Sequence, residues 1–149
     1  VGEFPPRDYT LAVWATWEAP KDRLGQVVSA WEGMMDDPLR ICVDGGKLFA
    51  RVEAQRGYSA PGLDLEAGRW HHLAAVKRGP ELALYVNGQP AATLKLPQEV
   101  NSLSDQIALG GNPNYTGKSE HLACRLAGFV FYNRAMSGQE VRALHEAKP

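Results

Sequence analysis

The chain of 149 residues has the length of one domain, because separate hydrophobic cores each need about 100 to 200 residues. Its composition, with 44% hydrophobic and 22% charged residues, is globular and excludes an intrinsically disordered segment. The net charge is −1 and the basic residues are scattered, which excludes a nucleic-acid partner of the usual basic kind. No apolar run approaches the ~20 residues that cross a bilayer, so we expect no membrane insertion.

The first half of the chain has the residue pattern of short β-strands. From Tyr9 to Trp17, two sets of residues alternate with the period of two that places successive side chains on opposite faces. Asp44-Gly45-Gly46 consists of residue types that tolerate the positive φ of a tight reversal, which predicts a hairpin. The predicted strands here are 9–17, 26–31, 39–43 and 47–54, with a polar loop at 32–38.

The second half continues this pattern and contains the strongest local signal. Asn87-Gly88, the preferred pair of a two-residue turn, lies inside the alternating segment 81–96 and predicts a hairpin. Segment 69–77 is apolar in both alternating sets, so we expect a central strand that is covered on both faces. The remaining predicted strands are 106–109 and 122–132, separated by an irregular, glycine-rich loop at 110–120.

One short helix is predicted at the end of the chain. Ser137 and Glu140 have the spacing of a capping box, and Met136 and Val141 have that of a hydrophobic staple. Many short strands with one terminal helix indicate a two-sheet antiparallel sandwich formed by a single domain over residues 1–149. Cys42 and Cys124 both lie in strand-like segments, where either buried thiols or one disulfide would fit.

Four segments of the chain resemble the laminin G-like jelly rolls of the concanavalin A-like lectin and glucanase superfamily. They are Tyr-Thr-Leu-Ala-Val-Trp at 9–14, Gly-Arg-Trp-His-His-Leu-Ala-Ala-Val at 68–76, Leu-Tyr-Val-Asn-Gly-Gln at 84–89 and Tyr-Asn-Arg-Ala-Met-Ser at 132–137. Their order and spacing also agree with the family. The resemblance implies an all-β, concanavalin A-like jelly-roll sandwich with one short C-terminal helix.

The same resemblance implies a binding module rather than an enzyme. Such domains are usually non-catalytic, bind glycans or proteins, and are joined to other domains of secreted or cell-surface proteins, although the fold alone does not choose among these roles. Some relatives bind calcium. Many members carry an acid about five residues before the last motif, where this chain has Ala127 and Gly128, so a calcium site that uses that acid is not expected.

The residues themselves offer no catalytic constellation. Hydrolases of this fold use closely placed carboxylates on alternate positions of one strand, whereas Glu53 is isolated and Asp36 and Asp37 are neighbours that point apart. We expect these acids to be solvated. His71-His72 would point to opposite faces, one bonded within the core and the other in solvent, and His145 is expected on a solvated helix face.

A carbohydrate site needs a flat apolar ring that stacks on a pyranose, together with polar groups for its hydroxyls. Packing is the alternative role of the aromatic candidates, and for Tyr58 it is the stronger one. Trp14 and Trp70 lie within strands, where a large aromatic ring fills the core, so they are not chosen. The predicted carbohydrate-binding residues, which lie near loops, are Trp31, Tyr58, Asn112, Asn114 and Tyr115.

Calcium is the one cofactor that the sequence raises. Asn112, Asn114 and Glu120 place oxygen atoms on one loop, as a calcium site requires, but only one of them is charged, which favours ordinary loop polarity.

The predicted function is therefore a non-catalytic, lectin-like module that binds an oligosaccharide or polysaccharide as part of a larger secreted or cell-surface protein. A protein-interaction module of an adhesin or matrix protein is the alternative. A glycoside hydrolase or lyase of the same fold ranks third.

Overall fold

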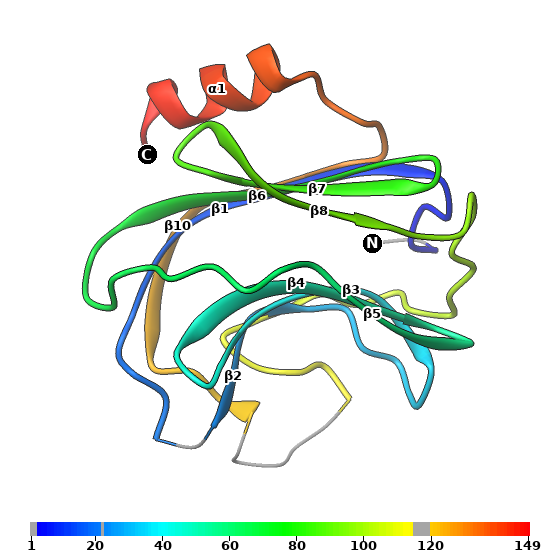
Figure 1. Ribbon diagram of the computed structural model, residues 1–149, viewed down its shortest axis with the longest axis horizontal. Coiled ribbons are helices and arrows are strands. Elements are labelled where there is room, and N and C mark those ends of the chain that lie inside the picture. Colours follow the sequence, from blue (N-terminus) through cyan, green and yellow to red (C-terminus); the bar gives the residue numbers. More distant parts are fainter. Residues whose placement is uncertain (1–2, 22, 115–119) are drawn as a thin grey trace.

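The computed structural model describes residues 3–21, 23–114 and 120–149, which form two facing antiparallel sheets and one helix (Figure 1). The first sheet contains β1 (Asp8–Trp17), β6 (His71–Arg78), β7 (Glu81–Val86), β8 (Gln89–Lys95) and β10 (Cys124–Tyr132), in the order β10-β1-β6-β7-β8. The second sheet contains β2 (Leu24–Ser29), β3 (Asp36–Asp44), β4 (Lys47–Ala54), β5 (Arg56–Ser59) and β9 (Ala108–Leu109), in the order β5-β4-β3-β2-β9. This is the predicted two-sheet jelly-roll sandwich.

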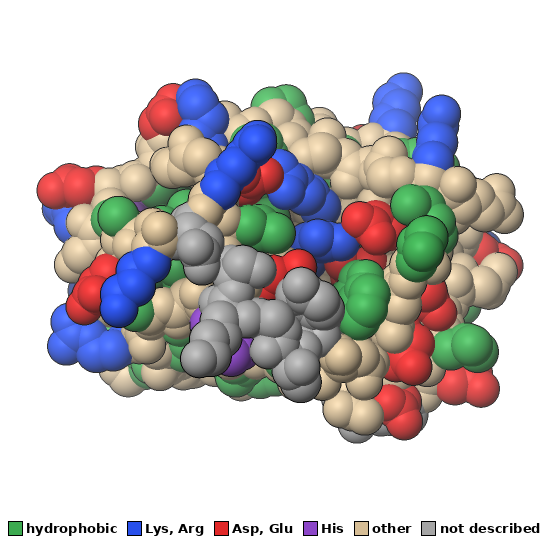
Figure 2. Space-filling view, turned by 90° about the horizontal axis from the view of Figure 1, so that it is seen from below, with side chains coloured by type: hydrophobic (Ala, Val, Ile, Leu, Met, Phe, Trp, Pro, Cys, Tyr) green, Lys and Arg blue, Asp and Glu red, His purple; other side chains and the backbone are tan. Residues whose placement is uncertain are grey.

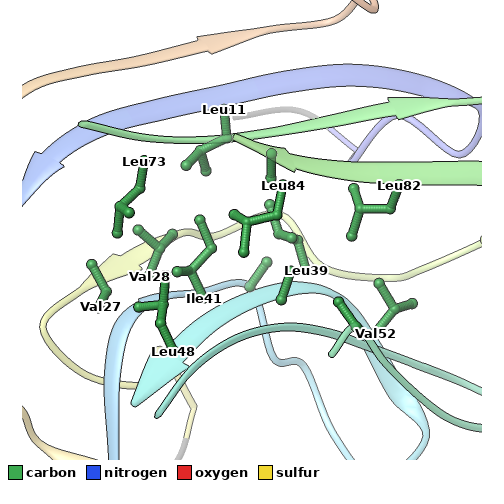
Figure 3. Packing of buried hydrophobic residues seen from close by; sticks show 14 of the residues in the cluster. Leu11, Val27, Val28, Leu39, Ile41, Leu48, Val52, Leu73, Leu82 and Leu84 are labelled. Carbon is green, nitrogen blue, oxygen red and sulfur yellow. The ribbon is translucent and has the colours of Figure 1, made fainter. Parts of the chain in front are cut away.

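The hydrophobic core lies between the inner faces of the two sheets. Leu11, Leu73 and Leu84 of the first sheet pack against Ile41 and Leu48 of the second (Figure 3). In β1, the alternating set that begins at Leu11 faces this core, as the period of two requires. The longer strands of the sandwich therefore each have one face committed to packing.

The turn signals are confirmed by the backbone. Asn87 and Gly88 have φ values of 51° and 77°, as the tight turn between β7 and β8 requires. The hairpin at Gly45 and Gly46 joins β3 and β4. β5 was not predicted, and it places Tyr58 in a strand rather than in a turn.

Helix α1 (Gly138–Ala147) covers the outer face of the first sheet (Figure 1). The predicted capping box is present, because the Ser137 side chain accepts from the Glu140 amide and the Glu140 carboxylate accepts from the Ser137 amide. Met136 and Val141 pack with Ala12 of β1 in a second apolar cluster. β6 is thus buried on both faces, as predicted. In the described ranges, no helix is long and apolar enough to span a membrane.

Two predictions about this outer face were wrong because the helix covers part of it. His72 is only 2% exposed and lies against the rings of Trp14 and His145, so it does not meet solvent. His145 stacks on Trp14 with ring centroids 5.2 Å apart, so it does not lie on a solvated face. His71 is also buried and is hydrogen-bonded through Nε2 to the carbonyl of Glu66, at 3.0 Å.

The assignment of two tryptophans to the core was also wrong. Trp14 pairs with His72 across β1 and β6 and shares its outer face, where it is half-buried. Trp70 immediately precedes β6 and is 44% exposed. Both rings therefore lie outside the sandwich core.

We predict that Ser137→Ala lowers the free energy of unfolding by about 1 kcal/mol, because the Glu140 amide then loses its capping acceptor. Ser137→Asp keeps an acceptor at the same position and should unfold close to the wild type. Urea denaturation of the three proteins measures the difference. Equal midpoints for the alanine and aspartate variants would contradict the assigned role of the cap.

We predict that His72 makes the domain less stable in acid. Burial, together with the neighbouring His145, lowers the pKa of His72 to about 4, whereas an unfolded histidine titrates near 6.5. The unfolded chain therefore takes up a proton first, and stability falls between about pH 6.5 and 4, by an amount on the order of 2 kcal/mol. Thermal unfolding across this range should show a steeper decline for the wild type than for His72→Gln, and parallel curves would refute the prediction.

Candidate functional site

The outer face of the second sheet is polar, unlike the helix-covered outer face of the first sheet. Along β3, Leu39, Ile41 and Val43 face the core. Arg40 lies on the opposite face, where its guanidinium meets a side chain of β4. Figure 2 looks onto this outer face and shows blue basic and red acidic side chains interleaved near its centre. A charged surface therefore lies directly on a rigid sheet.

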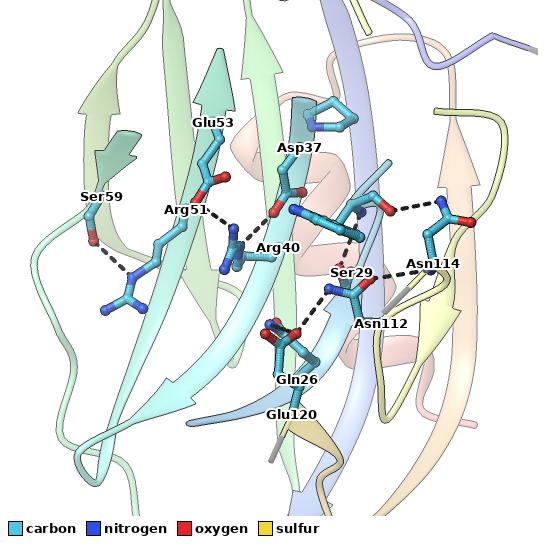
Figure 4. A network of polar contacts seen from close by, with 12 residues as sticks. Gln26, Ser29, Asp37, Arg40, Arg51, Glu53, Ser59, Asn112, Asn114 and Glu120 are labelled. Carbon is cyan, nitrogen blue, oxygen red and sulfur yellow. Dashed lines mark hydrogen bonds and ion pairs between the residues drawn. The ribbon is translucent and has the colours of Figure 1, made fainter. Parts of the chain in front are cut away.

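Arg40 joins two carboxylates on this face (Figure 4). Its Nε donates to Asp37 Oδ2 at 2.5 Å, and its Nη2 donates to Glu53 Oε1 at 2.7 Å. The Asp37 side chain is 0% exposed. The predictions of an isolated Glu53 and a solvated Asp37 were therefore wrong, because the pairing of β3 with β4 brings both acids to one guanidinium.

Arg40, Asp37 and Glu53 form a trio in which burial shifts the pKa values of Asp37 and Arg40. Burial raises the pKa of Asp37 to about 6, and the charge and hydrogen bond of Arg40 offset part of that rise. Burial alone would lower the pKa of Arg40, but the Asp37 and Glu53 carboxylates raise it above the ordinary value. Arg40 thus holds Asp37 and Glu53 together in one bonded group.

A pocket of about 280 Å³ lies at the β5 side of this face. Arg51 is oriented beside it by two contacts, from Nη2 to Asp44 Oδ2 at 2.8 Å and from Nε to Ser59 Oγ at 3.4 Å. The pocket therefore has a hydroxyl, a carboxylate and two guanidinium groups in its walls. Its lining residues are Arg40, Arg51, Val52, Glu53, Gly57, Tyr58 and Ser59.

Tyr58 is the one residue of the sequence-predicted set that reaches this pocket. Its ring is half-buried and packs against the sandwich core, while the Arg56 guanidinium lies 4.8 Å from the ring centroid. Tyr58 therefore contributes both to packing and to the wall of the pocket.

The other predicted residues meet beside β2, on the far side of the second sheet from β5. Asn114 Nδ2 donates to the Trp31 carbonyl at 3.1 Å and to Glu32 Oε2 at 2.8 Å, which joins its loop to the segment that follows β2. Asn112 Nδ2 donates to Glu120 Oε2 at 2.9 Å. The structure thus brings four predicted residues together and leaves Tyr58 apart. Tyr115, the remaining one, lies outside the described residues.

The predicted calcium ligands form a hydrogen-bonded group. Glu120 Oε2 accepts from both Asn112 and Gln26, the latter at 3.3 Å, while Oε1 of Gln26 is buried and has no hydrogen-bond partner among the residues that the structure describes. Among residues 3–21, 23–114 and 120–149, no three histidine, cysteine or acidic side chains converge as a metal site. Calcium at Asn112, Asn114 and Glu120 stays a prediction.

The two cysteines do not pair. Cys42 is buried among the charged residues of β3 and β4, and burial raises the pKa of its thiol to about 11. Cys124 is half-buried and also has a free thiol.

Sequence reasoning missed the central part of this site. Arg40 and Arg51 occupy polar positions within strands whose alternate residues are apolar, and that alternation was a usable signal. The partner of each charge could not be read, because it depends on which residues of β3 and β4 face one another.

We predict that Arg40→Leu destabilises the domain by about 3 kcal/mol at pH 8 and by less at pH 5. Without Arg40, the pKa of the buried Asp37 rises further above 6, so the folded protein must hold an unpaired charge or bind a proton that the unfolded chain does not hold at pH 8. Urea denaturation at both pH values tests this difference. Arg51→Leu, at a more exposed position, is the control and should cost less, and equal losses at the two pH values would count against the buried-charge explanation.

Comparison with solved structures finds the same fold in proteins of several kinds. The receptor binding domain of botulinum neurotoxin D matches with a TM-score of 0.75 and 12% identity over 99% of this chain and 38% of that chain. Trypanosoma rangeli sialidase matches with a TM-score of 0.69 and 18% identity over 93% of this chain and 23% of that chain. A SAP-like pentraxin from Limulus polyphemus matches with a TM-score of 0.69 and 20% identity over 97% and 73% of the two chains.

These identities show a shared fold, and this chain spans well under half of the neurotoxin and sialidase chains. No curated protein sequence matches closely enough to count as a relative. The sequence matches the laminin G-like family described as the concanavalin A-like lectin/glucanases superfamily over residues 2–142. With its two sheets, its terminal helix and this match over nearly its whole length, the chain belongs to the concanavalin A-like lectin/glucanase superfamily.

Proposed function

We propose that this domain is a non-catalytic carbohydrate-binding module that holds a glycan on the outer face of its second sheet. The observation that carries the proposal is the pocket where Arg51, Glu53 and Ser59 present hydrogen-bonding groups beside the half-buried ring of Tyr58. A sugar presents apolar C–H faces and a rim of hydroxyls, and these are the two surfaces that such a pocket complements.

The positions of these groups also favour binding. Arg51 is held by Asp44 and Ser59, so little conformational entropy is lost when a ligand contacts it. Glu53 is held by Arg40 and keeps part of its side chain accessible. Because the pocket is shallow and open to water, we expect affinities in the micromolar to millimolar range.

Proteins of similar fold support a carbohydrate partner. Cell entry of botulinum neurotoxin type C depends on interaction with two ganglioside molecules, and the binding domain of neurotoxin DC has been solved in complex with SialylT. The sialidase match adds a fold relative solved with a sialic acid derivative. We propose that this chain also binds a glycan, and that it lies outside the cell or at the cell surface within a larger protein.

A hydrolytic role is less well supported by the same geometry. Two carboxylates do converge, but Asp37 is fully buried and both acids are bonded to Arg40. An acid catalyst must reach the glycosidic oxygen of its substrate, which Asp37 cannot do from beneath the surface. The trio therefore serves to hold the binding face in place.

A protein-interaction module is the second candidate, and one surface feature favours it. Met34 and Leu103 are 86% and 82% exposed; Met34 lies in the turn just before Asp36, and the Asp36 carboxylate accepts from the Leu103 amide. Exposed apolar side chains that lie close together often mark protein contacts. This feature is small and lies outside the pocket, so we rank it below the carbohydrate proposal.

Calcium remains part of the proposal as an ordering ion. Asn112, Asn114 and Glu120 would hold it through their oxygen atoms, which requires the two amides to turn from their present hydrogen bonds. The ion would order the loop beside Trp31, which lies across the second sheet from the Arg51 pocket.

A glycan-array screen of the domain, run with calcium and again with chelator, tests this proposal. We expect selective binding that falls about tenfold or more in Arg51→Met, since a charge-assisted hydrogen bond is lost. Arg69→Met removes an exposed arginine away from the pocket and is the matched control. A blank array in both buffers would favour a protein partner, and loss of signal only with chelator would establish the ion's role.

A further inference from the structure

A second pocket lies on the opposite side of the molecule, on the outer face of the first sheet. It has a volume of about 520 Å³ and mainly apolar walls. Its lining residues are Trp14, Trp70, Ala127, Lys148 and Pro149. None of them belongs to the pocket of the second sheet.

Strand register places the two indole rings on the same face. Trp14 of β1 lies directly opposite His72 of β6 and Ala127 of β10, so these three share the outer face. Trp70 is two residues before His72, which puts it on that face when the chain is extended. Trp14 therefore lies in the row of residues that crosses the sheet at His72, and Trp70 lies beside that row on the same face.

The end of α1 explains why this part of the face is open. The helix covers His72 through His145, but it ends at Ala147 and leaves Trp70 exposed. Ala127 has a small side chain. Gly128 has a φ of 59°, and a Cβ atom added to it would lie 3.4 Å from both Trp14 Cδ1 and Pro149 Cβ. Larger residues at these two positions would occupy the space beside Trp14.

The hydrogen-bonding groups of this pocket are unused. Among the described residues, neither the indole N–H of Trp14 nor that of Trp70 donates a hydrogen bond, and the Lys148 ammonium forms no ion pair. Flat aromatic faces with free donors at their edges suit the C–H face and the hydroxyl rim of a pyranose. The volume is within the usual range of about 300 to 1,000 Å³ for small-ligand sites.

We infer that this pocket is a second carbohydrate site, in which one sugar ring stacks on Trp70 against the wall formed by Trp14. The inference adds a site to the proposed function and does not share residues with it. Because the two sites lie on opposite outer faces, one domain would hold two glycan segments at once. Such an arrangement raises the overall affinity for dense glycans through effective concentration.

Nuclear magnetic resonance of the indole and backbone N–H groups tests this inference. The four tryptophans give separate indole signals, and Trp17, which is buried in the core, is an internal reference. The probes are cellohexaose, the hexamer of N-acetylglucosamine and sialyllactose, each titrated to millimolar concentration. We expect the signals of Trp14 and Trp70 to shift in a saturable way with at least one probe.

Three variants assign the response to the pocket. Trp70→Ala should lower the affinity read at Trp14 about tenfold, and Ala127→Phe should do the same by filling the pocket while keeping both indoles. Leu103→Ala removes an exposed apolar side chain elsewhere and should change nothing. Arg51→Met should leave the Trp14 and Trp70 response intact, because it changes only the pocket of the second sheet.

The outcomes separate the two proposals. Shifts confined to residues around Arg51 would overturn the second site and leave the proposed function standing. Shifts at Trp14 and Trp70 alone would support the second site and count against the pocket of the second sheet. No shifts with any probe would overturn both, and a response at Trp70 that Ala127→Phe does not reduce would overturn this inference as well.

Discussion

Burial of the inner faces of the two sheets is the interaction on which the rest of this domain depends. Fully burying one Leu, Ile or Val side chain contributes about 1.5 to 3 kcal/mol, and both sheets supply many such side chains to the shared core. Once the inner faces of both sheets are committed in this way, a ligand can reach only the outer faces or the loops. The two outer faces then differ in character, since α1 covers part of one and charged side chains lie on the other.

The sequence predicted the elements well because their signals are local. The alternation in β1, the Asn87-Gly88 turn and the Ser137 capping box each depend on residues close together in the chain. The same alternation also placed Trp14 in the set opposite Leu11, so its outward position could have been read. We instead gave more weight to the general tendency of tryptophan to fill cores, which was wrong here.

The candidate site was predicted less completely because its contacts are long-range. Asp37 and Arg40 are three residues apart, an odd spacing that would put them on opposite faces of a regular strand. A register irregularity between them restores a common face, and β4 then supplies Glu53. Neither the irregularity nor the cover that α1 gives to His72 has a local signature in the sequence.

The buried trio of Arg40, Asp37 and Glu53 also has a consequence for the history of this family branch. A change at one of these positions leaves a charge without its partner inside a low-dielectric environment, so we expect selection against single replacements. Related sequences should therefore either keep all three residues or exchange them together for uncharged ones. An alignment of close homologues would show this as strong covariation among these three positions.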